Sequence, residues 1–147
     1  MPMTLKNLLG LSLDAVAPDK AHISKLLAAA ERNIADAKLH GLSTENRFDA
    51  AYKAIMQVAM VALNANGFRT MTSKPGHHQT AIQTLPTSVG LAPAKVIVLD
   101  ALRKHRNLSD YSGDLVPEAA AAECLASASE LLAHVRGWLA SNRSDLL

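Results

Sequence analysis

The chain has 147 residues, a formal net charge of +2 and an apolar content of 49%, of which aromatic residues supply little at 3% of the chain. This length suits a single domain with a real core, and a core of Leu, Ala, Val, Ile and Met favours packed helices over a β-sandwich. The small net charge does not by itself indicate nucleic-acid binding, and the lone Cys124 excludes a disulfide framework or a multi-thiolate metal site.

The amino-terminal segment has superficial features of a signal peptide. Lys6 precedes the apolar residues 8–13, and Ala15-Val16-Ala17 resembles a cleavage site. The apolar run is too short for export and ends at Asp14. No other stretch approaches membrane-spanning length. The sequence therefore predicts a soluble, cytoplasmic protein with no membrane partner.

Helical periodicity recurs in four long segments, which cover about 19–40, 44–66, 93–107 and 117–141. A shorter piece over 77–89 is expected to be bent or broken near Pro86. Together these segments predict one all-α domain over residues 1–147, an antiparallel up-and-down helical bundle of four long helices plus one short helix. We expect the residues before Thr4 and after Asn142 to be loose.

The second segment has the clearest pattern, because eight apolar, alanine or tyrosine residues share one helical face. They are Phe48, Ala51, Tyr52, Ile55, Met56, Ala59, Met60 and Leu63. Ser43 or Thr44 suits the start of this helix, and Gly67 suits its end. In the third segment, the apolar run 96–99 fits a buried strand by composition, but its flanks extend the pattern and favour a helix.

Charge is distributed unevenly along the chain. Residues 67–111 carry six Lys/Arg against two acids, a net +4, while the remainder has nine against eleven, a net −2. Three of the six histidines also lie in this stretch. A locally positive surface suits an anionic partner, and an ordinary solvated face is the alternative.

The first candidate site is the run 103–113, at the end of the third helical segment. Arg106 lies four residues after Leu102 and borders the predicted buried stripe. A planar guanidinium in such a place can bind a phosphate through two parallel hydrogen bonds. The alternative is an Arg106–Asp110 ion pair that only secures the helix end.

The second candidate site is the run 67–79, a basic loop that places His77 and His78 at the start of a helix. Free backbone N–H groups at a helix start favour an anion, Ser73, Lys74 and His77 could add donors, and imidazole titrates near neutrality. Neighbouring histidines point to different faces without an acidic partner, so we predict no metal and no cofactor. A solvated capping loop is the alternative.

Three motifs resemble the HEPN superfamily of helical-bundle proteins, which is named for nucleotide binding. They are Arg47-Phe48-Asp49-Ala50-Ala51-Tyr52, the 67–74 turn with Gly76-His77-His78, and the run 102–111. The resemblance covers about 21–140, and its most specific part is the Arg-Asn-x-x-Asp-Tyr pattern that begins at Arg106.

The resemblance implies a homodimer. Many HEPN proteins are metal-independent ribonucleases, often toxins paired with a nucleotidyltransferase antitoxin, with an Arg-(four to six residues)-His motif from each subunit at the dimer cleft. Arg106 and Asn107 match the opening of that motif. Tyr111 stands where four intervening residues would place the histidine, and the next histidine is His134.

This departure leaves two alternatives open. A tyrosine with a pKa of about 10 supplies little base at neutral pH, so either His77 or His78 provides the imidazole or the cleft binds without efficient catalysis. The expected function is RNA or nucleotide binding by a HEPN-type dimer with a degenerate ribonuclease motif. A protein-interaction module that partners a nucleotidyltransferase is the alternative, and a purely structural bundle is the third. The residues expected to act in catalysis are Arg106, His77, His78 and Tyr111, and those expected to bind the ligand are Arg103, Asn107, Asp110, Arg69 and Lys74.

Overall fold

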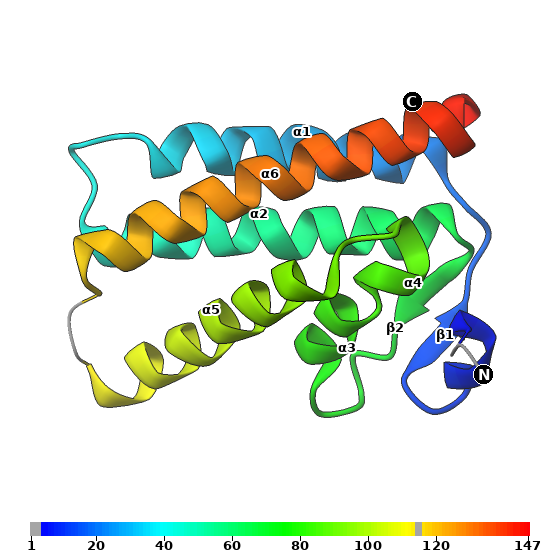
Figure 1. Ribbon diagram of the computed structural model, residues 1–147, viewed down its shortest axis with the longest axis horizontal. Helices are drawn as coiled ribbons and strands as arrows, with labels where there is room; N and C mark the ends of the chain where they lie inside the picture. The colour runs from blue at the N-terminus through cyan, green and yellow to red at the C-terminus, as the bar shows by residue number, and fades with distance from the viewer. Residues whose placement is uncertain (1–3, 114–115) are drawn as a thin grey trace.

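The computed structural model describes residues 4–113 and 116–147, and for residues 109–112 it describes the backbone alone. The fold is mostly helical, as predicted. Its long helices in the described ranges are α1 (Lys20–Ala37), α2 (Thr44–Ala65), α5 (Pro93–Ser112) and α6 (Glu118–Asn142). α1 and α5 run in one direction, and α2 and α6 run in the other (Figure 1). No helix within the described residues is long and apolar enough to cross a membrane.

Helix α2 is the central helix of the fold, with α1 and α6 packed against it (Figure 1). The sequence pattern predicts one buried face. The structure instead buries α2 on most of its sides, because Ala54, Val58 and Val61 are also fully buried. A helix that is apolar almost all round is stable only inside a core. The exposed remainder of α2 is one narrow stripe, which includes Asp49 and Lys53.

The beginnings of the first two helices follow ordinary capping chemistry. The Asp19 carboxylate accepts a hydrogen bond from the His22 backbone N–H at 3.2 Å, and the Ser43 hydroxyl accepts one from Asn46 N–H at 3.2 Å. Each cap satisfies a backbone donor that the first turn leaves without a partner. The helix starts near Asp19 and Thr44 could therefore be predicted to within a residue.

The segment predicted to be bent or broken near Pro86 is broken into two helices, α3 (His77–Gln83) and α4 (Leu85–Val89). The chain breaks at Thr84, whose hydroxyl donates to the Thr80 carbonyl at 2.9 Å. Pro86 lies in the first turn of α4, where its missing N–H costs nothing. Gly90 ends α4 with a positive φ of 68°, a conformation that glycine adopts without strain.

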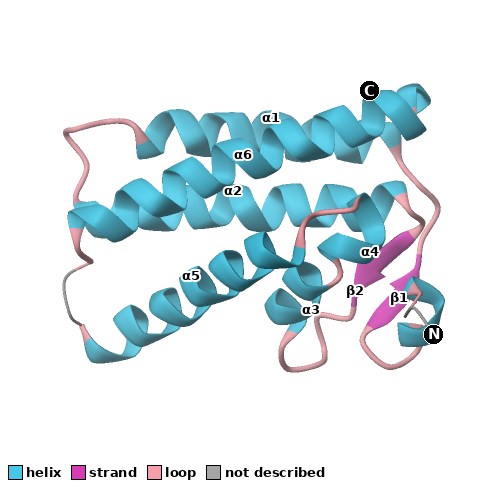
Figure 2. Ribbon diagram, viewed as in Figure 1, coloured by secondary structure: helices cyan, strands magenta, loops and turns pink. Residues whose placement is uncertain are grey.

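A small antiparallel sheet, not predicted from the sequence, connects β1 (Leu13–Ala15) to β2 (Phe68–Thr70) (Figure 2). Leu13 pairs with Thr70 and is fully buried, and Leu5 in the short 3-10 helix Leu5–Leu8 is also in the core. Strands of three residues are too short to show an alternating pattern. Because Leu5 and Leu13 are buried, the apolar amino-terminal run is part of the folded domain.

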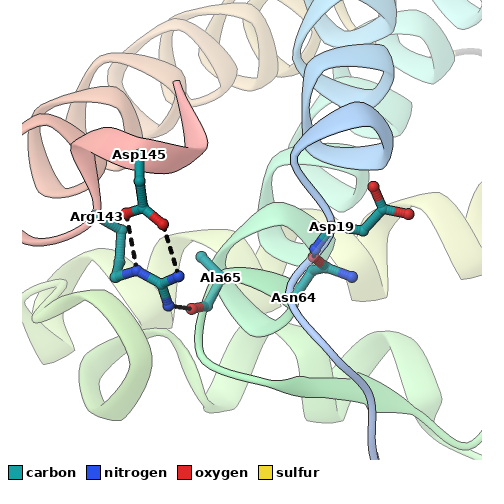
Figure 3. A network of polar contacts seen from close by, with 5 residues as sticks. All are labelled: Asp19, Asn64, Ala65, Arg143 and Asp145. Carbon is teal, nitrogen blue, oxygen red and sulfur yellow. Dashed lines mark hydrogen bonds and ion pairs between the residues drawn. The ribbon is translucent and has the colours of Figure 1, made fainter.

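The prediction of a loose end after Asn142 is wrong, whereas the residues before Thr4 lie outside the described part of the chain. The 3-10 helix Ser144–Leu146 follows α6, and Leu146 is buried. The Arg143 guanidinium donates to the Ala65 carbonyl at 3.2 Å and to the Asp145 carboxylate at 3.0 and 3.1 Å (Figure 3). Nearby, the Asn64 side-chain oxygen accepts from the Asp19 backbone N–H at 2.9 Å. These bonds join the ends of α1, α2 and α6.

Helix α5 is longer and less embedded than predicted. It continues to Ser112, five residues past the expected end at Asn107. It packs mainly on α3 and touches α2 and α6 little, so its carboxyl half diverges from them (Figure 1). Side chains of its carboxyl half still reach α2, where the His105 ring lies 5.4 Å from that of Phe48, and the candidate site lies where α2, α3 and α5 meet.

Candidate anion-binding groove

Tyr52 is the point at which three helices meet. Its side chain comes from α2 and is only 2% exposed. The Arg106 guanidinium of α5 lies over the ring, with Cζ 5.2 Å from the ring centroid. The Tyr52 hydroxyl lies 3.2 Å from Nδ1 of His78 on α3. The two runs that the sequence marks as separate candidate sites therefore meet on one tyrosine.

Tyr52, His78 and Arg106 line a groove of about 400 Å³, here called the central groove. The other lining residues all come from α2 and are Asp49, Lys53, Met56, Gln57 and Met60. One wall is therefore basic and aromatic, and the floor is the partly exposed stripe of α2. The groove has the size of a small-ligand site.

Burial shifts the pKa values of Tyr52 and His78 in opposite directions. Burial raises the pKa of Tyr52 to about 12, against the opposing charges of Arg106 and Arg103, so the phenol stays protonated at neutral pH. Burial lowers the pKa of His78 below 6.5, and the charges of His77, Arg106 and Arg103 lower it further. His78 is therefore a neutral imidazole at neutral pH.

The direction of the Tyr52–His78 hydrogen bond decides what the imidazole can do. If the tyrosine O–H donates to Nδ1, the His78 proton is on Nε2, which then serves as a donor to a ligand. If Nδ1–H donates to the tyrosine oxygen, Nε2 has a lone pair and can act as a base. The first arrangement favours binding of an anion beside Arg106, and the second is the one that general-base catalysis requires.

Two other predicted residues lie beside this site. The His77 ring contacts the His78 ring edge-on, with centroids 4.6 Å apart. Arg103 is held by Asp100, with Nε 2.9 Å from Oδ1, and both side chains are largely buried. Arg103 does not line the groove, but its charge acts on the pKa values of Tyr52 and His78.

The remaining predicted residues are not brought into the central groove. Arg69 of β2 is exposed, lies 3.8 Å from the Asp14 carboxylate and lines a separate pocket. Lys74 and Asn107 are exposed and do not line the groove. The side chains of Asp110 and Tyr111 lie outside the described residues, as does the Arg106–Asp110 ion pair predicted as an alternative.

The two ends of the Arg47–Tyr52 motif have different roles: Arg47 holds helices together, and Tyr52 lines the central groove. Arg47 donates to the Glu118 carboxylate at 2.8 Å and to the Ala37 carbonyl at 3.1 Å, which ties α2 to α6 and to the end of α1. Tyr52 is buried, as its helical spacing predicts, and it also lines the groove, a role that the spacing does not indicate. The available signal was its hydroxyl, because a buried tyrosine O–H needs a hydrogen-bond partner.

The described residues of this site include no metal-binding cluster and no thiol. In the described part of the chain, no group of His, Cys, Asp and Glu side chains is arranged to hold a metal ion. Cys124 is fully buried beneath the Phe48 carbonyl, and burial raises the pKa of its thiol to about 12. This ionisation is far from that of a nucleophilic thiolate.

Comparison with protein-family models, with curated proteins and with solved structures finds no match to this chain. The HEPN resemblance therefore rests on the three sequence motifs alone.

The lowered pKa of His78 predicts a pH dependence of stability. Above pH 6.5 the imidazole is neutral in both the folded and the unfolded state. Below that value the unfolded chain binds a proton more readily, so the free energy of unfolding falls as the pH is lowered. His78→Gln should reduce this loss, whereas His40→Gln, in an exposed turn, should not. Urea unfolding on both sides of pH 6.5 measures the free energy of unfolding of each variant. If that free energy has the same pH dependence in wild type and His78→Gln, the prediction is contradicted.

Proposed function

We propose that the protein is a HEPN-type RNA- or nucleotide-binding protein whose ligand lies in the central groove, and that it turns RNA over slowly or not at all. The observation that carries the proposal is the meeting of Arg106 and His78 on Tyr52. Both runs were singled out from the sequence for anion chemistry, and the fold supplies the groove between them.

The groove offers complementary contacts to each part of a nucleotide. The Arg106 guanidinium, which lies over the Tyr52 ring, is a donor for a phosphate, and Lys53 adds positive charge at the rim. The Asp49 carboxylate can accept from ribose hydroxyls. Met56 and Met60 offer an adaptable apolar surface for a base.

Efficient cleavage through the ribose 2′-hydroxyl needs both a base and an acid poised near neutral pH. The central groove supplies one neutral imidazole, whose Nδ1 is engaged by Tyr52, and a phenol with a pKa of about 12. The imidazole and the phenol therefore do not form an acid and a base that both titrate near neutral pH. We therefore favour binding over turnover.

Binding of a fluorescently labelled, single-stranded RNA tests the proposal directly. We expect saturable binding, competition by nucleoside monophosphates, and little cleavage of the bound RNA on a gel. The function is wrong if neither RNA nor nucleotide binds, and the preference for binding is wrong if the RNA is cleaved rapidly.

The outer face of α5 supports the homodimer that the resemblance implies. Along it, residues recur at alternating steps of three and four: Ala94, Ile97, Ala101, Lys104 and Leu108. Ile97 and Leu108 are each 71% exposed, which is unusual for large apolar side chains. This spacing is typical of a helix seam between two chains. Leu108 and Arg106 are two residues apart and face opposite sides of the helix, so a dimer through this face leaves each groove open and does not bring the two Arg106 side chains into the shared cleft that the resemblance implies.

Light scattering at micromolar concentration should show a dimer. Ile97→Asp with Leu108→Asp should give a folded monomer, because each substitution places a charge in the seam. Leu39→Asp, at an exposed leucine away from α5, is the matched control and should remain dimeric. A monomeric wild type at this concentration would contradict the proposed dimer. A nucleotidyltransferase is the other partner that the resemblance implies.

A further inference from the structure

The central groove continues into two neighbouring depressions through side chains that they share. Lys53 and Gln57 also line a groove of about 420 Å³ against α1, here called the α1 groove, which contains Arg32 and Asp36. Met60 also lines a pocket of about 170 Å³, here called the β2 pocket, which is formed with β2 and the start of α1. The three depressions therefore share walls and lie next to one another on the surface along α2.

The floor of this surface is a single stripe of α2. Asp49, Lys53, Gln57, Met60 and Asn64 follow one another at steps of three or four residues, which places them on one helical face. At a rise of 1.5 Å per residue, the stripe is about 22 Å long. This length greatly exceeds what a single bound phosphate needs.

Helix α1 borders the stripe along its length. The Asn33 side-chain amide donates to the Gln57 side-chain oxygen at 2.9 Å, and the Asp19 N–H donates to the Asn64 side chain at 2.9 Å. On the other side lie Arg106 and His78 and then β2. The two hydrogen bonds hold the α1 border in place against α2. The surface between the two borders is here called the track.

Each depression contributes a cation. Arg32 lies in the α1 groove, Arg106 in the central groove and Arg69 in the β2 pocket, with Lys53 at the first junction. The acids on the same surface are Asp36 and Asp49, and Arg69 lies 3.8 Å from Asp14 beside it. The β2 pocket also contains the half-buried Phe68, on which a base can stack. Cations spaced along a groove, with an aromatic ring at one end, suit a chain of phosphates better than a single one.

We propose that the ligand is a single-stranded RNA several nucleotides long, which lies along α2 and contacts all three depressions. This inference rests on the proposed function and specifies its substrate class. An RNA oligonucleotide should bind much more tightly than a mononucleotide, because only the oligonucleotide reaches Arg32 and Arg69 while it occupies the central groove.

The test compares a random-sequence octaribonucleotide with the four nucleoside 5′-monophosphates on the full chain. Arg32→Ala and Arg69→Ala should each lower the ratio of the two affinities several-fold. Each should also reduce the slope of log affinity against log salt by about 0.7, as expected for one lost phosphate contact on a single strand. Arg136→Ala, an arginine of α6 paired with Glu31, is the matched control and should change neither quantity.

The outcomes separate this inference from the proposed function. If the octanucleotide binds no more tightly than the monophosphates, or if Arg32→Ala and Arg69→Ala leave the ratio unchanged, the extended track is wrong while the central groove stands. If neither probe binds, the proposed function itself is wrong. If an oligoglutamate peptide displaces the octanucleotide at equal concentration, the surface recognises acidic protein and the assignment to RNA is overturned.

Discussion

Arg106→Ala should weaken RNA binding by at least about ten-fold, because a charge-assisted hydrogen bond to a phosphate contributes roughly 1.5–3 kcal/mol. The guanidinium lies over the Tyr52 ring, 5.2 Å from its centroid, at the wall of the central groove. Arg106→Lys should restore binding only in part. An ammonium keeps the charge but cannot make two parallel hydrogen bonds or stack flat on the ring.

The control for this experiment is Arg136→Ala, which removes the same side chain from α6 and lines none of the three depressions along α2. Fluorescence anisotropy gives the affinities, and thermal unfolding shows whether each variant is folded. Equal affinity in wild type and a folded Arg106→Ala variant would show that the anion binds elsewhere. Full rescue by lysine would show that charge alone matters.

Ala59→Asp should have the largest effect on stability, with a loss of about 3–5 kcal/mol in the free energy of unfolding. Ala59 is fully buried on the central helix α2, and an aspartate there adds atoms to a close-packed core as well as an unpaired charge. Native domains are stable by roughly 5–15 kcal/mol, so much of the total would be lost. Urea unfolding followed by circular dichroism measures it.

Ala126→Asp makes the same chemical change at an exposed position of α6 and should lower the free energy of unfolding by only about 0.7 kcal/mol, the difference in helix propensity. The comparison isolates burial from helix propensity, since both residues lie inside long helices. Equal stability of the two variants would contradict the central position of α2.

Local chemistry made some of the fold predictable. The caps at Asp19 and Ser43 and the glycine that follows α4 act through their own side chains or backbone freedom, so they can be read without knowing the neighbours. The all-round burial of α2 could not be predicted in the same way. Its alanines look neutral in sequence, and only the approach of α1 and α6 makes them core residues.

The candidate site shows the same division. The sequence singles out Arg106 and His78 by residue type, but their meeting depends on Tyr52, which lies 26 residues before His78 and follows the pattern of a core residue. The groove forms where side chains of α2, α3 and α5 meet, a tertiary arrangement that the periodicity of α5 does not encode. The short pairing of β1 with β2 likewise lies below the length at which a strand pattern is visible.

The imidazole resonances of the six histidines in the wild-type chain test most directly whether RNA binds in the central groove. His78 lines the central groove, and the His77 ring contacts the His78 ring. His134 is hydrogen-bonded to the Val89 carbonyl at 2.7 Å, and His40 lies in the turn between α1 and α2. In a titration with the octaribonucleotide followed by NMR of the imidazole rings, the resonances of His78 and His77 should move saturably, and those of His134 and His40 should stay in place. Saturable shifts at His134 or His40 with none at His78 would contradict RNA binding in the groove formed by Arg106, Tyr52 and His78.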